Sequence, residues 1–221
     1  MEIIDYSRTL YLIKLSPNFI RHEQWKRKIN KQSFKFLKDF CETNDIEHQL
    51  EHLIFRNRCN LLFIELTQNH YKINSIFLVN YSDNHIFLPP SIFLLKDTLT
   101  FLSFISVNYL KRWGRIFKEM KKVREDKGDF LHLVDNFNLK HLHCESIHLD
   151  IFPILFDHKQ KDLEHLTIRN CHIKHIDKRI NELKKLKWLD LSRNPIRIID
   201  FELNLPRLRT LRLNECKLDN G

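Results

Sequence analysis

The stretch LDLSRNPI, residues 189–196, decides how this 221-residue chain folds. Leu189, Leu191 and Ile196 are separated by polar residues at the spacing of a short strand that runs into a turn. Asn194 stands at that turn, where its side-chain amide can bond to backbone groups that would otherwise be buried without partners. The remaining question is whether this strand and turn stand alone or recur along the chain.

The same frame, L-x-x-L-x-L-x-x-(N/C)-x-L, recurs in the C-terminal part of the chain at intervals of 22 to 24 residues. Its copies are 139–149 (LKHLHCESIHL), 163–173 (LEHLTIRNCHI), 186–196 (LKWLDLSRNPI) and 208–218 (LRTLRLNECKL), with Ile147 replacing Asn or Cys in the first. This frame and spacing are typical of leucine-rich repeats, whose coils stack into a solenoid. The sequence therefore predicts an α/β fold with about four leucine-rich repeats.

The apolar positions of the frame are expected to point inward and to stack from coil to coil. A thiol in the column of Asn194 would be a small, weakly hydrogen-bonding substitute for the amide. The segment 174–185, with apolar residues at helical spacing, is expected to close a coil on the convex side. The predicted structural repeat positions are Leu163, Leu166, Cys171, Leu189, Leu191, Asn194, Leu211, Leu213 and Cys216.

The residues between the leucines are expected on the concave side, which is the usual binding face of a solenoid. These side chains are mixed in charge, which favours a protein partner over a nucleic acid. Trp188 is the preferred anchor because Trp and Arg dominate interface energetics, although its neighbours could instead cover it. The predicted partner-binding residues are His141, His143, His165, Arg169, Trp188, Asp190, Arg193 and Arg212.

Catalysis and metal binding are not predicted. The chain has neither a glycine-rich phosphate-binding motif nor an H-E-x-x-H zinc motif. His141, His143 and His165 share the expected concave face, but no carboxylate or thiol completes a ligand set there at reliable spacing. We therefore expect no metal, no cofactor and no enzymatic activity.

The first half is expected to form a small α/β domain over residues 1–115, followed by a basic linker or helix end over 116–138 and the repeats over 139–221. Strands are expected at 9–15, 52–66, 73–80 and 85–88, and a helix at 31–43 with Phe34, Leu37 and Phe40 on one face. A second helix is expected from Ser91, with an apolar stripe through Leu95, Leu99, Leu102 and Ile105.

The sequence also indicates the cellular compartment of the protein. The five cysteines form no C-x-x-C pair, which fits a reducing environment, and acidic residues occupy the place of the positive charge in a secretory signal. The apolar stretch 98–110 is shorter than the roughly 20 residues that cross a bilayer, and we interpret it as a buried helix. The predicted location is therefore nuclear or cytoplasmic, without secretion or a membrane span.

The net charge of +9 is concentrated in the first half, above all in residues 111–127. Such a run can meet nucleic acid or an anionic membrane surface. Three acidic residues interrupt it, so a solvated helix end and linker is the preferred interpretation, and nucleic-acid binding is not expected.

Residues 162–196 resemble the opening repeats of the eukaryotic leucine-rich repeat protein 1 family. The similarity lies in Leu-Glu-His-Leu at 163–166, Cys171, Asp177, Arg179, Leu-Lys-x-Leu at 183–186 and Leu-Asp-Leu-Ser-x-Asn-x-Ile at 189–196. The resemblance implies a pleckstrin-homology-like domain before the repeats. It also implies a substrate receptor of an elongin-linked cullin-RING ubiquitin ligase that acts on the replicative helicase at chromatin.

The sequence departs from that family because it ends at LDNG, directly after the fourth frame. An elongin and cullin partner is therefore expected only for a longer form that carries a recruiting box. Two alternatives remain open, a leucine-rich repeat adaptor of another pathway and a basic binder of nucleic acid or membrane surfaces.

Overall fold

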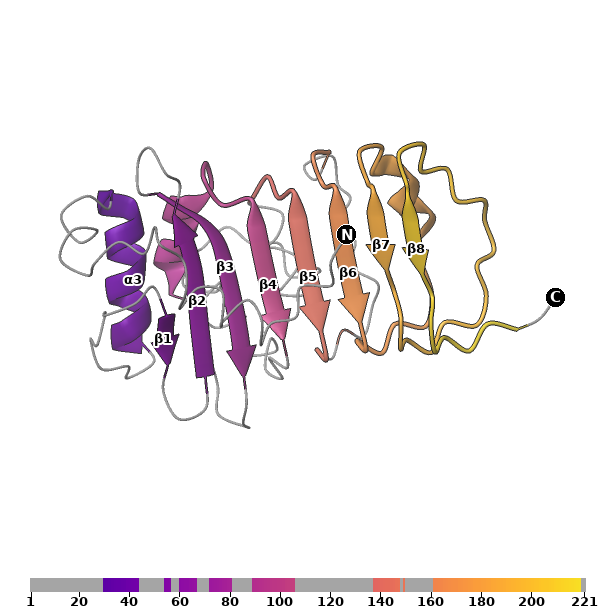
Figure 1. Cartoon of the computed structure of the whole chain (residues 1–221), viewed down its shortest axis with the longest axis horizontal. Coiled ribbons are helices and arrows are strands. Elements are labelled where there is room, and N and C mark those ends of the chain that lie inside the picture. Colours follow the sequence, from indigo (N-terminus) through magenta and orange to yellow (C-terminus); the bar gives the residue numbers. More distant parts are fainter. Residues whose placement is uncertain are drawn as a thin grey trace, which may run out of the picture.

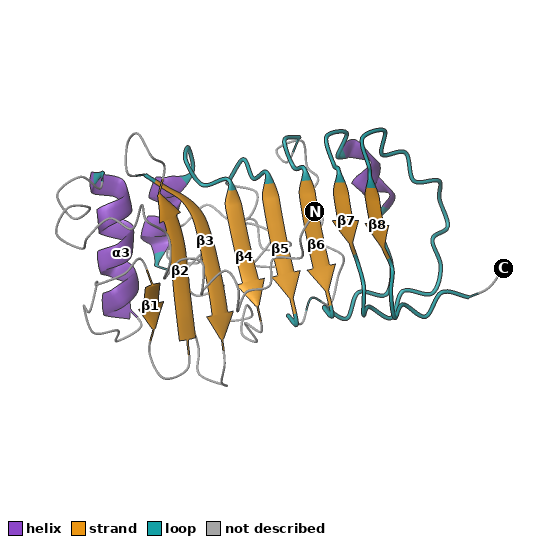
Figure 2. Cartoon of the chain, viewed as in Figure 1, coloured by secondary structure: helices purple, strands orange, loops and turns teal. Residues whose placement is uncertain are grey.

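The computed structural model describes residues 30–43, 54–56, 60–66, 72–80, 89–105, 137–147, 149 and 161–219. Its strands lie side by side in one eight-stranded sheet, in chain order from β1 to β8 (Figure 1). The strands are β1 (Ile54–Arg56), β2 (Asn60–Leu66), β3 (Ile73–Asn80), β4 (Phe101–Ile105), β5 (His141–Glu145), β6 (His165–Arg169), β7 (Trp188–Asp190) and β8 (Thr210–Arg212). The helical segments are α3 (Lys31–Thr43) and the 3₁₀ helices η1 (Pro90–Leu95) and η3 (Lys178–Glu182) (Figure 2).

Strands β3 to β8 are parallel, whereas β1, β2 and β3 pair antiparallel. In the parallel part, equivalent positions of the repeat frame lie opposite one another. Leu142 pairs with Leu166, Leu166 with Leu189, and Leu189 with Leu211. The prediction of a parallel solenoid of about four coils is confirmed.

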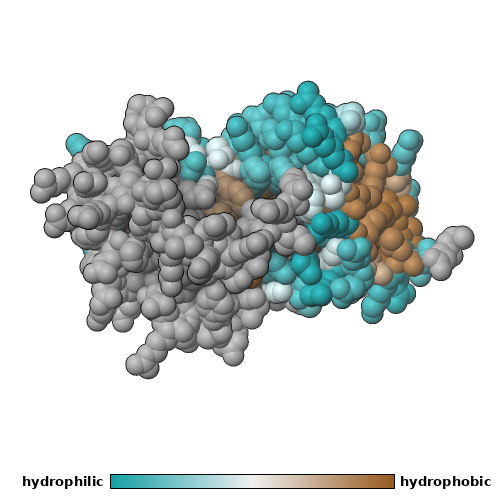
Figure 3. Space-filling view, in the orientation of Figure 1, coloured by the Kyte–Doolittle hydropathy of each residue, from teal (hydrophilic) through white to brown (hydrophobic). Residues whose placement is uncertain are grey.

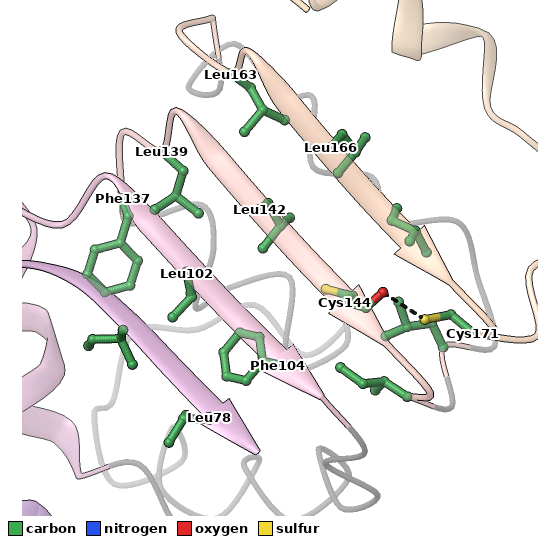
Figure 4. Packing of buried hydrophobic residues seen from close by; sticks show 14 of the residues in the cluster. Leu78, Leu102, Phe104, Phe137, Leu139, Leu142, Cys144, Leu163, Leu166 and Cys171 are labelled. Atoms are coloured by element: carbon green, nitrogen blue, oxygen red, sulfur yellow. Dashed lines mark hydrogen bonds between the residues drawn. The ribbon is translucent and has the colours of Figure 1, made fainter. Parts of the chain in front are cut away.

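The inward leucines form the core of the solenoid. Figure 4 shows Leu102, Leu142 and Leu166 side by side on adjacent strands, and all three are almost fully buried. Leu189 continues the same column at 0% exposure. This continuous layer removes apolar surface from water in every interior coil, which is the main stabilising contribution in a solenoid.

The prediction of a helix through Leu102 and Ile105, and of a buried helix at 98–110, is wrong. Within residues 89–105, only Pro90–Leu95 is helical, as a 3₁₀ helix, and Phe101–Ile105 is strand β4, whereas residues 106–110 lie outside the described residues. Leu102 and Phe104 are both buried, which is the two-residue alternation of a strand. In an apolar run this short, the helical and strand periods fit equally well, so pairing with β3 and β5 decides.

Helix α3 occupies the predicted range, but one residue of its predicted face is wrong. Phe34 is 44% exposed, whereas Phe36, Leu37 and Phe40 are buried. The buried stripe begins at Ser33, whose backbone N–H bonds to Asn30 Oδ1 at 2.9 Å and whose hydroxyl accepts from the Ile73 N–H at 3.0 Å. These two bonds orient the helix so that the face formed by Ser33, Phe36, Leu37 and Phe40 lies toward β3.

The other expectations for the first half have mixed outcomes. The strand at 73–80 is confirmed as β3, and the stretch 52–66 contains the two strands β1 and β2. The expected strands at 9–15 and 85–88 and the basic run 111–127 lie outside the described residues. Because β4 pairs with both β3 and β5, the sheet continues from the expected N-terminal domain into the repeats. The domain boundaries and the pleckstrin-homology-like arrangement stay predictions.

Within the described ranges, no helix has the length and apolar character needed to cross a membrane.

Candidate protein-binding face

The candidate site is the outer face of the parallel strands, opposite the leucine core, and we call it the concave face. One row of this face places flat rings in direct pairing register, with Phe101 opposite His141, His141 opposite His165, and His165 opposite Trp188. We call these four residues the ring row. Each is the first residue of its strand, so strand pairing alone sets their order.

Three rings of this row, those of Phe101, His141 and His165, stack on one another. The centroids of Phe101 and His141 are 5.3 Å apart with an interplanar angle of 23°. Those of His141 and His165 are 4.4 Å apart at 12°. Phe77 extends the row diagonally, with its centroid 4.5 Å from that of Phe101. Aromatic and imidazole faces therefore cover each other along the row.

Burial favours the neutral form of both imidazoles. Desolvation by burial, followed by repulsion from His165, lowers the pKa of His141 to about 4. Desolvation also lowers the pKa of His165, although Glu164 partly opposes that shift. A neutral imidazole offers one hydrogen-bond donor and one acceptor.

At the C-terminal end of the row, Arg212 lies over Trp188. The guanidinium carbon is 4.4 Å from the centroid of the indole ring, which is cation–π geometry. Trp188 is partly buried in this arrangement. The structure thus joins the predicted anchor residue to a cation on the next strand.

A group of charged side chains lies further along the same strands. Glu145 Oε2 is 3.3 Å from His143 Nε2, and Glu145 Oε1 is 3.8 Å from Arg169 Nε. The hydrogen bond from His143 lowers the pKa of Glu145. In the turns that follow β7 and β8, Arg193 Nε donates a hydrogen bond to Glu215 Oε1 at 3.0 Å. Two of the three predicted binding arginines, Arg169 and Arg193, therefore have a glutamate partner.

Asp190 differs from its predicted role, because it is only 6% exposed. Its carboxylate accepts the backbone N–H of Ser192 at 2.9 Å, which fixes the chain at the end of β7. The alternation of the repeat frame placed Asp190 on the concave face but could not show that its neighbours cover it. A side chain buried in this way is not available to a partner.

The column of Asn194 joins neighbouring coils through the backbone. Asn194 Oδ1 accepts the N–H groups of Cys171 and Ile173 at 2.9 and 3.1 Å. Its Nδ2 group donates to the carbonyl oxygens of Ile168 and Leu191 at 2.6 and 2.8 Å. One buried amide thus bonds to these four backbone groups, three of which belong to the preceding coil.

The thiols of the same column also bond to the preceding coil. Cys171 Sγ donates to the carbonyl oxygen of Cys144 at 3.5 Å (Figure 4), and Cys216 Sγ donates to that of Leu191 at 3.4 Å. Burial raises the pKa of the Cys171 thiol to about 12 and that of Cys144 well above its usual value. Burial therefore favours the uncharged form of both thiols, which is the less nucleophilic form.

The remaining structural positions follow their place in the solenoid. Leu163, Leu166, Leu189 and Leu191 are buried, whereas Leu211 is 41% exposed and Leu213 is partly buried in the last coil. Leu211 occupies the same column as Leu189, but no further coil among the described residues covers it.

The described residues contain no group of three or more His, Cys, Asp or Glu side chains arranged to hold a metal ion. The geometry of the histidines gives the reason. His141 and His165 lie nearly parallel, so their ring faces rather than their nitrogens meet. His143 is engaged with Glu145.

Sequence reasoning missed Phe77 and Phe101 as members of this face. Phe101 was assigned to a helix, although its alternation with buried Leu102 and Phe104 was a possible strand signal. The frame of residues 139–149 predicts Glu145 on this face, although Glu145 is not among the predicted partner-binding residues. Its pairing with Arg169 depended on coil-to-coil register.

Residues 161–218 match the family model described as Leucine rich repeat. Comparison with curated proteins and with solved structures gave no match. Repeat solenoids of this kind typically serve as non-enzymatic scaffolds for protein interactions. Together, the match, the recurring frame and the parallel coils show that residues 161–218 form leucine-rich repeats.

Proposed function

We propose that the concave face binds a protein and that the chain is the substrate-recognition part of a cullin-RING ubiquitin ligase receptor. The observation that carries the binding role is the ring row ending in the Trp188–Arg212 pair. Tryptophan and arginine are enriched among residues that dominate interface energy. The partner-binding residues of the proposal are His141, His143, His165, Arg169, Trp188, Arg193 and Arg212.

The resemblance of residues 162–196 to the leucine-rich repeat protein 1 family supports the receptor role. A nuclear protein of the chromatin-bound replication machinery would then be the substrate, gripped by the repeats and by a pleckstrin-homology-like N-terminal domain. Elongin and cullin would join through a recruiting box in a longer form. An adaptor role in another pathway uses the same concave face with a different partner.

The test is affinity purification of the 221-residue chain from a nuclear extract of its own source, with quantitative mass spectrometry. The binding variant is Trp188→Ala combined with Arg212→Ala. The matched control is Arg197→Ala combined with Lys217→Ala, because both side chains are exposed outside the ring row. Replicative-helicase subunits should be recovered with the parent and control proteins and lost with the binding variant.

Different partners lost with the binding variant would contradict the receptor role and support the adaptor. The same partners recovered with all three proteins would contradict the concave face as the site. A steep fall of recovery as salt rises would favour a binder of nucleic acid or an anionic surface, since neutralised phosphates release counterions.

A further inference from the structure

We propose that the ring row binds an extended protein segment that carries an aromatic residue and, about three positions away, an Asp or Glu. This inference rests on the proposed binding function and specifies the chemistry of its partner. The aromatic residue would lie on His141 and His165, and the acidic residue would pair with Arg212.

The first argument concerns the direction of the rings. Because Phe101, His141 and His165 stack face to face along the row, their edges are the parts left to meet a partner. Ring edges carry the positive end of the quadrupole and favour the negative face of another ring. All three side chains are partly exposed. An aromatic side chain laid across these edges would complete an edge-to-face arrangement.

The second argument concerns hydrogen bonding. Each neutral imidazole provides a donor and an acceptor, which matches the N–H and C=O of a peptide backbone. The charged groups around the imidazoles are Glu164, Lys140 and Lys187, and Glu164 is paired with Lys187. This part of the row therefore suits an extended peptide better than a phosphate chain.

The third argument concerns charge at the end of the row. No described carboxylate forms an ion pair with Arg212, whereas Arg169 lies beside Glu145 and Arg193 beside Glu215. Asp190, opposite Arg212 in the sheet, is buried and bonds to Ser192. The guanidinium held over Trp188 is thus placed to receive a carboxylate from a partner, with its N–H groups pre-oriented.

The spacing follows from the sheet. His165 lies on β6 and Arg212 on β8, two strand separations of about 4.8 Å each. An extended chain advances about 3.3–3.6 Å per residue, so about three residues cover this distance. A segment crossing the strands can therefore place its aromatic and acidic side chains on both features at once.

The test begins with selection of a phage-displayed library of random 12-residue peptides on the immobilised full chain. The enriched peptides should share an aromatic residue with an Asp or Glu about three positions away. The affinity of the best peptide, and of its analogue with Asn or Gln in place of the acid, is then measured by fluorescence polarisation.

Two variants separate the two contacts. Arg212→Gln should weaken the acidic peptide about 10-fold and abolish its advantage over the amide analogue, since a paired charge is worth about this much. His165→Ala should weaken both peptides about equally and preserve that advantage. Arg197→Gln, an exposed arginine outside the row, should leave all affinities unchanged. Urea unfolding of each variant confirms that the fold is intact.

The inference is overturned by selection without an aromatic–acidic pattern, by failure to enrich any peptide, or by binding that Arg212→Gln does not alter. The inference is also overturned if a 12-nucleotide oligothymidylate binds more tightly than any selected peptide. In each of these cases, the receptor function would still be supported if replication proteins were captured from the nuclear extract and their capture depended on Trp188. Conversely, patterned peptides that bind while no nuclear protein is captured would support the inference and contradict the receptor function.

Discussion

Asn194 shows how much of a coil can depend on a single side chain. Its amide is 1% exposed and bonds to backbone groups of two coils. Each buried backbone group left without a partner costs roughly 1–3 kcal/mol. The residue therefore stabilises the turn that follows β7 and the one that follows β6.

Replacement of Asn194 by Ala should lower the free energy of unfolding by about 2–4 kcal/mol, because several backbone groups lose their partner. Asn194→Cys should lower it by about 1 kcal/mol less than Asn194→Ala does. A thiol at this position can still donate a hydrogen bond to the preceding coil, as those of Cys171 and Cys216 do. Asn214→Ala, at an exposed asparagine, should change stability by less than about 0.5 kcal/mol. Urea unfolding measures all three, and equal losses for Ala and Cys would contradict this account of the column.

His141 makes stability depend on pH. Its pKa is about 4 in the folded chain and 6.5 without the fold, so the unfolded state binds more protons between these values. The stabilising contribution of the neutral ring is complete above pH 6.5 and is lost progressively as pH falls toward 4. After allowance for the partial solvent exposure of the ring, we expect a loss of about 1 kcal/mol from pH 7 to pH 5.

The control for this dependence is His141→Phe, which keeps a flat ring beside Phe101 and His165 but does not titrate. Unfolding free energies of the parent and the variant are compared at pH 7 and pH 5. The parent should lose more than the variant over this interval. Equal losses would show that other groups cause the pH dependence.

Among the structural elements, the turn after each repeat strand has an unusual backbone. Ser146, Asn170, Arg193 and Glu215 have φ angles of 54°, 52°, 61° and 59°, and all occupy the eighth position of the frame. This left-handed conformation is unfavourable for residues other than glycine. Its recurrence shows that the repeat geometry, rather than the residue type, imposes the conformation.

Arg193→Gly should therefore be more stable than Arg193→Val by about 2 kcal/mol, because a β-branched residue strongly disfavours positive φ. Both variants lose the ion pair with Glu215, so their difference isolates the backbone effect. At exposed Arg197, whose φ is not positive, Gly should have no such advantage over Val. Thermal unfolding measures the four variants, and a similar Gly advantage at both sites would refute the argument.

At the scale of the whole molecule, the solenoid differs between its interior and its last described coil. Figure 3 shows hydrophobic surface on the right, over the C-terminal coil. Among the large apolar residues near this end of the described chain, Ile198, Leu211 and Leu218 are 58%, 41% and 40% exposed. In a solenoid each interior coil is covered by the coils on both sides. A side chain of the same column is therefore more exposed in the last described coil.

Leu189→Ala should destabilise the chain by about 2–5 kcal/mol, because it opens a cavity between two coils. Leu211→Ala, in the same column, should cost less than about 1.5 kcal/mol since part of the side chain already contacts water. Denaturant unfolding of the two variants gives the comparison. Equal costs would indicate that Leu211 is covered in solution, for example by another molecule.

The sequence by itself determined the repeats. The spacing of Leu189, Leu191, Asn194 and Ile196 is a local property of one coil, and its recurrence predicted the parallel pairing now seen from β5 to β8. The helix at 31–43 and strand β3 were predictable for the same reason, since apolar periodicity is written within each segment.

The tertiary structure alone decided how the first half joins the repeats and which side chains form the concave face. Phe101 became a strand residue because β3 and β5 pair on both sides of β4. Asp190 became buried, and Phe101, His141 and His165 became a stack, through contacts between residues many positions apart. Periodicity states which way a side chain points within its own coil, whereas burial and stacking depend on the coils beside it.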